Sequence, residues 1–253
     1  MEPVFRTLEI AVSLATRAIG TKITYQGLEN IPERGGAVMA INHTSYVDWW
    51  PAALAAYQRR RRMRFMIKTE MQDVKVVNFL IKHSGTIPVD RRAGGSAYAM
   101  AVERLRAGEI VGMYPEATIS RSFELKEFKT GAARMAQDAQ VPIVPLIVWG
   151  AQRRWTKDHP RDMGRKNIPI TAAAGQSIRA AGTIDETSAA MREVMTSLLY
   201  RVQEEYPHPQ GAYWVPRRLG GSAPTVDEAK ALEEAELAER ARKRAEREAK
   251  SRR

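Results

Sequence analysis

The sequence predicts an α/β domain with a mixed, largely parallel sheet flanked by helices. Two observations predict it: short, strongly apolar segments alternate with segments of helical periodicity, and Gly, Pro and polar residues separate them. The chain of 253 residues can bury one sizeable core with an appendage at either end. We expect an N-terminal amphipathic helix over residues 1–20, one domain over 21–206, and a Pro/Gly-rich loop with a charged, helical or disordered tail over 207–253.

Strands are expected where a short apolar run lies between turn-forming residues. They cover residues 21–28, 36–42, 64–68, 85–90, 110–114, 143–149 and 168–174. Helices are expected where apolar residues recur every three or four positions. They cover residues 4–19, 48–54, 74–81, 96–106, 130–139 and 186–206.

The first helix admits two interpretations. Its apolar residues Val12 and Ile19 share a face, Thr16 falls largely elsewhere on the helical wheel, and Gly20 would end the helix. The helix either packs on the core or lies in a membrane interface, with its apolar face in lipid beside Arg17.

The composition excludes several kinds of site. Without cysteine, the chain has no disulfide, no thiolate zinc site and no cysteine nucleophile. The four histidines are scattered without ligand spacing, so we expect no metal. The formal net charge of +11 suits nucleic acid, an anionic membrane surface or an anionic substrate. No segment is long and apolar enough to span a bilayer, and the N-terminus lacks the layout of a secretory signal.

Residues 40–50 (AINHTSYVDWW) join the end of a buried strand to the start of a helix. His43 follows the strand, and Asp48 lies five residues later in the first helical turn. Such a turn can fold the carboxylate back onto the imidazole, which fixes its tautomer and stabilises the imidazolium formed when His43 accepts a proton. The pair has the composition of a general base with its orienting group, although a turn histidine near a capping carboxylate is the commoner arrangement.

A cluster of arginines follows this helix. It is either a solvated loop or a surface that attracts anionic lipid headgroups. Such attraction contributes about 1 kcal/mol of binding free energy per basic residue, and salt weakens it. The cluster consists of Arg59, Arg60, Arg61, Arg62 and Arg64.

Three further segments place useful residues near expected strands. Residues 85–91 (GTIPVDR) end in Arg91, whose guanidinium can bind a phosphate with two parallel hydrogen bonds. Residues 114–120 (YPEATIS) place Glu116 behind a proline that stiffens the turn. Residues 141–146 (VPIVPL) carry two prolines at the entrance to an apolar strand.

Together, the four segments resemble the family of glycerolipid acyltransferases that acylate glycerol 3-phosphate or lysophosphatidic acid. They match, in order, the family's NHxxxxD, GxxxxxR, FPEGTRS and VPxxP blocks. The matching segments are residues 42–48, 85–91, 114–120 and 141–145. The resemblance covers about residues 20–180, and it implies the family's fold.

The resemblance implies direct acyl transfer from a thioester. His43 would remove the proton from an acceptor hydroxyl as it attacks the thioester carbonyl of acyl-CoA or acyl carrier protein, and Asp48 would hold the histidine. Base catalysis of this kind contributes roughly 10²–10⁴-fold. Direct attack agrees with the absence of cysteine and of a Gly-x-Ser-x-Gly segment.

The resemblance also implies where the acceptor binds. Arg91 and the turn containing Glu116, Ala117 and Thr118 would hold its glycerol phosphate, so that orientation contributes to the rate. Glu116 cannot attract a phosphate by charge, so we expect it to bind a hydroxyl, His43 or a neighbouring base.

The third block departs from the family at two positions. Ala117 replaces the usual glycine, so we expect this residue to avoid a strongly positive φ. Ile119 replaces the usual arginine and removes one phosphate donor. Arg121, Lys126 or Lys129 could take its place, and we count Arg121 among the acceptor-binding residues.

We therefore expect a peripheral enzyme on the cytoplasmic face of the plasma membrane that acylates 1-acyl-glycerol 3-phosphate to phosphatidic acid in phospholipid synthesis. Its partners would be a phospholipid membrane, lysophosphatidic acid and acyl-CoA or acyl carrier protein, without cofactor or nucleic acid. One alternative is an acyltransferase for glycerol 3-phosphate or for another lysophospholipid or glycolipid hydroxyl. The other is a non-catalytic basic protein that binds membranes or nucleic acid.

Overall fold

The structure, a computed structural model, describes residues 3–69, 85–89 and 94–251. The chain divides into two compact units. The larger unit comprises Met1–Ile119 and Glu127–Tyr206, and the smaller, C-terminal unit comprises Ser120–Lys126 and Pro207–Arg253. The expected helix over 74–81 and the expected phosphate ligand Arg91 lie outside the described residues.

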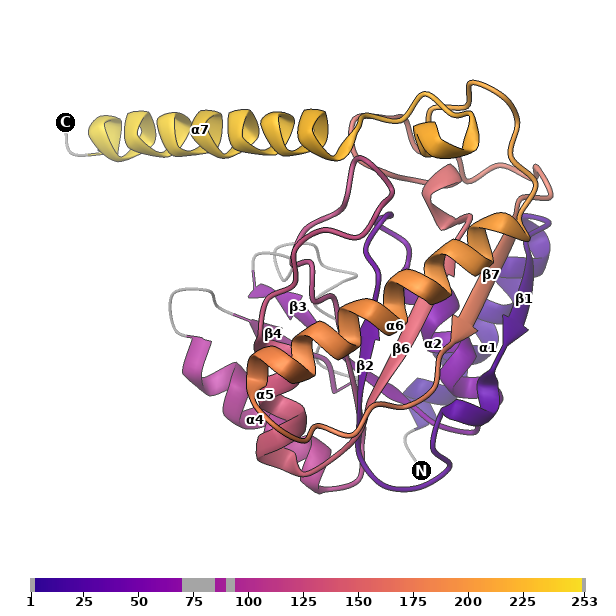
Figure 1. The fold of residues 1–253 in the computed structure, drawn as a ribbon, viewed down its shortest axis with the longest axis vertical. Helices are drawn as coiled ribbons and strands as arrows, with labels where there is room; N and C mark the ends of the chain where they lie inside the picture. The colour runs from indigo at the N-terminus through magenta and orange to yellow at the C-terminus, as the bar shows by residue number, and fades with distance from the viewer. Residues whose placement is uncertain (1–2, 70–84, 90–93, 252–253) are drawn as a thin grey trace. The chain divides into compact units, whose positions relative to one another are not determined.

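In the part of the chain that the structure describes, the larger unit contains a seven-stranded sheet of order β1-β7-β6-β2-β5-β3-β4 (Figure 1). Among these strands β6 and β7 run antiparallel, and the other neighbours run parallel. The predicted mixed, largely parallel sheet is confirmed. The strands are β1 (Lys22–Gln26), β2 (Ala37–Ile41), β3 (Met63–Lys68), β4 (Ile87–Val89), β5 (Ile110–Met113), β6 (Ile143–Trp149) and β7 (Pro169–Ala174).

Helices flank this sheet, with α6 crossing in front of it and α2 lying behind it in Figure 1. α2 tolerates Pro51 because the proline lies in its first turn, where the backbone N–H has no partner within the helix. α6 begins with a capping box in which Thr183 and Glu186 bond each other's backbone N–H. The helices are α1 (Pro3–Ala18), α2 (Trp49–Gln58), α4 (Gly94–Arg106), α5 (Gly131–Ala139) and α6 (Ile184–Glu204).

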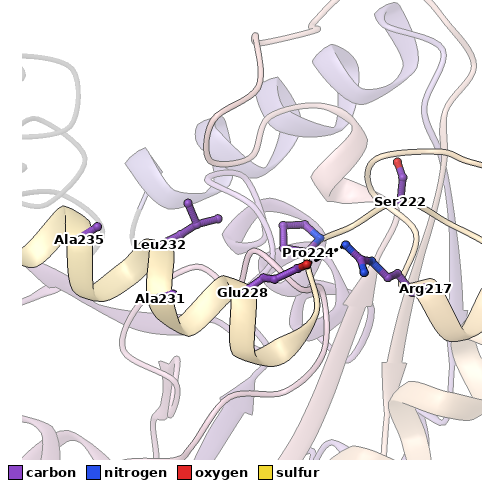
Figure 2. Close-up of a pocket in the computed structure, with 7 residues that line it drawn as sticks. All are labelled: Arg217, Ser222, Pro224, Glu228, Ala231, Leu232 and Ala235. Atoms are coloured by element: carbon purple, nitrogen blue, oxygen red, sulfur yellow. Dashed lines mark hydrogen bonds and ion pairs between the residues drawn. The ribbon is translucent and has the colours of Figure 1, made fainter.

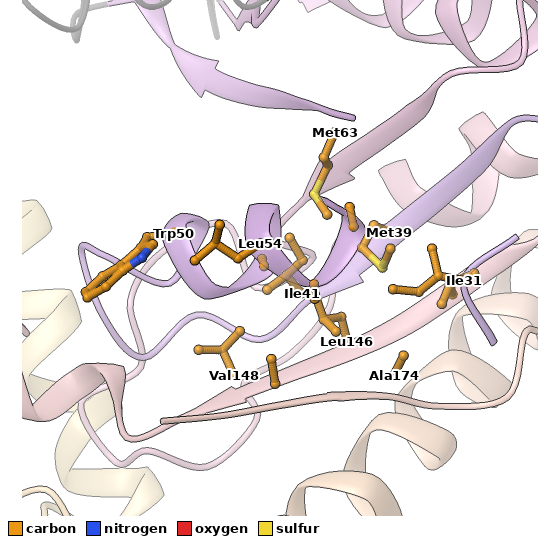
Figure 3. Packing of buried hydrophobic residues seen from close by; sticks show 14 of the residues in the cluster. Ile31, Met39, Ile41, Trp50, Leu54, Met63, Leu146, Val148 and Ala174 are labelled. Carbon is orange, nitrogen blue, oxygen red and sulfur yellow. The ribbon is translucent and has the colours of Figure 1, made fainter. Parts of the chain in front are cut away.

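The core beneath α2 holds β2 in place. Every residue of β2 is buried, as expected for a parallel strand covered on both faces. Met39 and Ile41 of β2 pack with Leu54 of α2 and with Leu146 and Val148 of β6 (Figure 3). Each such side chain contributes about 1.5–3 kcal/mol when fully buried. The well-packed strand therefore fixes the position of the residues directly after β2.

The expected N-terminal helix is present as α1 and packs on α2. Trp50 Nε1 donates a hydrogen bond to Thr16 Oγ1 at 2.8 Å, and Thr16 is buried. Thr16 thus lies on the core side, although the helical wheel places it elsewhere. Ile10 and Leu14 are exposed. No described helix has both the length and the apolar composition that crossing a bilayer requires.

The C-terminal unit contains the short turn η4 (Arg217–Leu219) and the helix α7 (Val226–Ser251). The tail is therefore helical. Ion pairs join the loop of residues 120–126 to the rest of this unit. They link Arg121 to Glu236 (2.9 Å), Lys126 to Glu233 (2.6 Å) and Arg218 to Glu124 (2.7 Å).

Candidate active site

The predicted base and its orienting carboxylate meet at the carboxyl end of β2. His43 is the second residue after β2, and Asp48 directly precedes α2. Nδ1 of His43 lies 3.2 Å from Oδ2 of Asp48. The side chain of Asp48 is fully buried, whereas that of His43 is 18% exposed. The imidazole can therefore meet a substrate while the carboxylate behind it stays dry.

Asp48 also binds the turn that carries His43. Its Oδ2 accepts the backbone N–H groups of Thr44 (2.8 Å) and Ser45 (2.7 Å). Burial raises the pKa of the Asp48 carboxyl, and its contacts with His43, Ser45 and Thr44 oppose this rise. Because the carboxylate oxygen accepts, Nδ1 of His43 carries the shared proton and Nε2 keeps its lone pair. This tautomer suits a general base that works through Nε2.

Glu116 reaches the same place from the turn that follows β5, and β5 neighbours β2 in the sheet. Its buried Oε1 accepts the backbone N–H of His43 at 2.7 Å. Of the partners expected for Glu116, the structure shows His43, contacted through its backbone. Glu116 therefore fixes where His43 leaves the strand.

Tyr114, at the start of the same turn, is a site residue that sequence reasoning missed. Its ring stacks on the imidazole of His43, with centroids 4.0 Å apart and planes inclined by 18°. Burial, reinforced by the charge of Asp48, raises the pKa of Tyr114 well above its ordinary value. The phenol therefore stays protonated at neutral pH. The signal available in the sequence was its place two residues before Glu116.

Two polar side chains anchor the loop that carries His43. Asn42 pairs with the backbone of Val148 on β6, accepting its N–H at 2.7 Å and donating to its carbonyl oxygen at 3.0 Å. Ser45 Oγ donates to the carbonyl oxygen of Trp155 at 2.6 Å. Asn42 thus extends the pairing of β2 with β6 beyond the strand end. The asparagine of the first block is a structural anchor.

The expectation that Ala117 avoids a positive φ is wrong. Its φ is +62°. Backbone hydrogen bonds close the turn, from Ala117 N–H to the carbonyl oxygen of Tyr114 (3.0 Å) and from Thr118 N–H to the carbonyl oxygen of Glu116 (2.8 Å). The left-handed conformation costs a non-glycine residue roughly 1–2 kcal/mol. The turn therefore keeps the backbone conformation that suits glycine.

Replacing Ala117 by glycine should relieve this strain. Glycine loses about 0.5–1 kcal/mol more backbone entropy on folding, so we expect a net gain of about 0.5–1 kcal/mol in the free energy of unfolding. Urea unfolding measures it. Ala99→Gly is the control, because Ala99 is exposed in the helix α4, where glycine should cost about 1 kcal/mol. Equal losses in both variants would contradict the strain.

Two of the expected replacements for the missing phosphate donor, Arg121 and Lys126, are paired with glutamates. Ile119, which stands where the family has arginine, is apolar and buried, so this position supplies no cation. Arg121 and Lys126 belong to the C-terminal unit, where Glu236 and Glu233 hold them. Binding of the acceptor by Arg121, and by the partly exposed Thr118, stays a prediction.

Three members of the arginine cluster serve the fold. Arg64 is buried and pairs with both carboxylate oxygens of Glu109, at 2.9 and 3.2 Å. Arg61 donates to three backbone carbonyl oxygens at 2.6–2.8 Å, and Arg59 pairs with Glu33 at 2.8 Å. Arg60 is exposed. The interpretation of the cluster as an anionic-lipid surface therefore depends chiefly on Arg60.

A pocket lies in the C-terminal unit, between α7 and the segment before it (Figure 2). An ion pair between Arg217 and Glu228 (2.8 Å) spans its wall. None of the predicted site residues lines it; the lining residues are Arg217, Ser222, Pro224, Glu228, Ala231, Leu232 and Ala235. Among the described residues, no cluster of three or more His, Asp or Glu side chains is placed to hold a metal ion.

Comparison with known proteins gives sequence matches over about half of the chain or more. The chain is 33% identical over 125 residues to the 1-acyl-sn-glycerol-3-phosphate acyltransferase of Bacillus subtilis, covering 48% of this chain and 60% of that one. It is 26% identical over 157 residues to the enzyme of the same name from Borreliella burgdorferi, covering 61% and 62%. The chain thus spans less than two thirds of the length of these relatives.

The fold matches a solved structure as well. The crystal structure of the 1-acyl-sn-glycerophosphate (LPA) acyltransferase PlsC from Thermotoga maritima superposes with a TM-score of 0.68 at 21% identity, covering 81% of this chain and 82% of that one. The profile of the family described as Acyltransferase matches residues 22–149. That match is about half of the chain and includes His43, Asp48, Tyr114 and Glu116. The chain belongs to this acyltransferase family.

Proposed function

We propose that the protein transfers a fatty acyl group from an acyl thioester to the free hydroxyl of 1-acyl-glycerol 3-phosphate, giving phosphatidic acid. The observation that carries this proposal is the contact between His43 and the buried Asp48, which leaves Nε2 as a base. The names of the bacterial relatives support the choice of acceptor. The acyl donor is acyl-CoA or acyl carrier protein.

In the proposed reaction, Nε2 of His43 takes the proton of the acceptor hydroxyl as its oxygen bonds to the thioester carbonyl carbon. The carbon–sulfur bond then breaks, and the thiolate leaves with the proton from the imidazolium, so that ester and thiol are the products. The carboxylate of Asp48 stabilises the imidazolium between these steps. Glu116 contributes through the backbone of His43, which it holds in position.

We further propose that the enzyme works as a peripheral protein on an anionic bilayer, the cytoplasmic face of the plasma membrane. Ile10 and Leu14 are exposed one turn apart on α1, 48% and 58% respectively, and such residues can enter a lipid interface. Exposed Arg60 and the net charge of +11 support attraction to anionic headgroups.

Thiol release from palmitoyl-CoA and oleoyl-CoA, with three acceptors in parallel, tests the proposed reaction. We expect release to require lysophosphatidic acid and to be far slower with glycerol 3-phosphate or a neutral lysolipid. The His43→Ala protein gives the background. Equal release with the neutral lysolipid would refute the role of the phosphate and favour a different lipid hydroxyl. Release from acyl carrier protein alone would identify the donor.

A further inference from the structure

The turn that follows β5 contacts His43 at two separate points. Glu116 holds the backbone N–H of His43 at 2.7 Å, and Tyr114 covers one face of the imidazole at a centroid distance of 4.0 Å. Pro115 lies between them and is buried. A residue before proline is confined to extended conformations, so the direction of Tyr114 is restricted by the chain itself.

The contact with Asp48 alone does not fix the plane of the imidazole. The separation of Nδ1 from Oδ2 is 3.2 Å, longer than the 2.7–2.9 Å typical of charge-assisted hydrogen bonds. One such bond restrains one edge of the ring and still permits tilting about that edge. Tilting moves Nε2, the atom that must meet the acceptor hydroxyl. A flat neighbour against the ring face removes this freedom.

We propose that Tyr114 is a positioning residue for acyl transfer: its ring, stacked on His43, sets the plane in which Nε2 meets the acceptor hydroxyl. This inference rests on the proposed function of the His43 site. It assigns the effect to the aromatic ring. The phenolic hydroxyl is dispensable in this assignment, which makes the proposal separable from one in which Tyr114 donates a proton.

Two substitutions separate the ring from the hydroxyl. Tyr114→Phe keeps the stack, so we expect kcat within about threefold of wild type. Tyr114→Leu removes the stack, and we expect kcat to fall by about 30–100-fold, the scale of a misplacement near 1 Å. The KM for acceptor and thioester should change by less than about threefold in either variant. Rescue by phenylalanine with a loss confined to kcat is the expected result.

Tyr57→Leu is the matched control, because Tyr57 of α2 is 40% exposed and should tolerate the change without loss of kcat. Far-UV circular dichroism at the assay temperature establishes that each variant is folded. A large loss in Tyr114→Phe would assign the effect to the hydroxyl and overturn the proposal. So would wild-type kcat in folded Tyr114→Leu.

A spectroscopic readout distinguishes failure of this inference from failure of the proposed function. A stacked aromatic ring shifts the imidazole Cε1–H proton resonance upfield, and the missing signal in His43→Ala assigns it. The resonance should move downfield in Tyr114→Leu and stay in place in Tyr114→Phe. If it does so while no acceptor supports transfer, the proposed function fails and the stack stands. An unshifted resonance in the wild type would refute the stack itself.

Discussion

His43→Ala is expected to abolish acyl transfer, with at least a 10²–10⁴-fold fall in kcat, roughly the contribution of a positioned general base. The substitution removes Nε2, the atom that takes the hydroxyl proton. Its described neighbours Asp48 and Tyr114 are poor substitutes as a base. The carboxylate of Asp48 is buried and binds backbone N–H groups, and the phenol of Tyr114 stays protonated. Steady-state thiol release with saturating acceptor and donor measures the loss.

The control for this substitution is His208→Ala. The ring of His208 lies 5.7 Å from that of Trp214 within the C-terminal unit, centroid to centroid, with the planes inclined by 47°, and its removal should leave kcat unchanged. Circular dichroism and urea unfolding exclude a folding defect in both variants. If folded His43→Ala retains near-wild-type kcat, His43 is not the base and the proposed mechanism is refuted.

The sequence was sufficient to place the central strands of the sheet because they are nearly continuous apolar runs. Residues 143–149, for example, read IVPLIVW and form the fully buried β6. A strand covered on both faces leaves such a run. Strand order is a different matter: β2 and β5 are neighbours although the chain between them passes through β3 and β4. No local pattern encodes that adjacency.

The same distinction explains the site. The pairing of His43 with Asp48 is local, so a spacing of five residues within one turn predicts it. The stack of Tyr114 on His43 and the hydrogen bond from the backbone N–H of His43 to Glu116 depend on β5 lying beside β2. Sequence order alone could not show that these residues meet.

The charge pattern did not show which arginines are exposed, for a related reason. Arg64 belongs to a run that resembles a solvated basic loop, yet its guanidinium is buried against Glu109. Composition records how many cations are present, whereas the register of β3 beside β5 decides which of them turns inward. Ala117 shows the same limit at the level of the backbone: the turn imposes φ of +62° in spite of the residue's preference.

Asp48→Asn is expected to lower kcat by about 10²–10³-fold while leaving the protein folded. Two opposite charges about 4 Å apart near a protein surface attract by about 4 kcal/mol, and the amide loses this stabilisation of the imidazolium. The amide oxygen should replace Oδ2, which accepts two backbone N–H groups. The amide nitrogen would then replace Oδ1, which has no hydrogen-bond partner among the described residues. The tautomer of His43 is thus kept, and the charge alone is removed.

As pH rises, the Asp48→Asn variant should become more stable relative to wild type. Burial raises the pKa of Asp48, so the folded state binds this proton more tightly than the unfolded state. Wild-type stability from this group is therefore present below about pH 4, the ordinary value, and is lost as pH rises through the raised pKa. The amide of the Asp48→Asn variant does not titrate, so the unfolding free energy of the variant minus that of wild type should increase with pH.

Urea unfolding between pH 4 and pH 7, paired with thiol release, tests both halves of this prediction. Asp185→Asn is the control, because Asp185 is exposed in the first turn of α6 and its substitution should leave kcat unchanged. A variant that loses about 2 kcal/mol or more at neutral pH would mean that Asp48 serves chiefly to hold the turn that carries His43. Wild-type kcat would remove its charge from the mechanism. A slow but stable variant would instead mean that the fold accepts a costly buried charge because the reaction requires it.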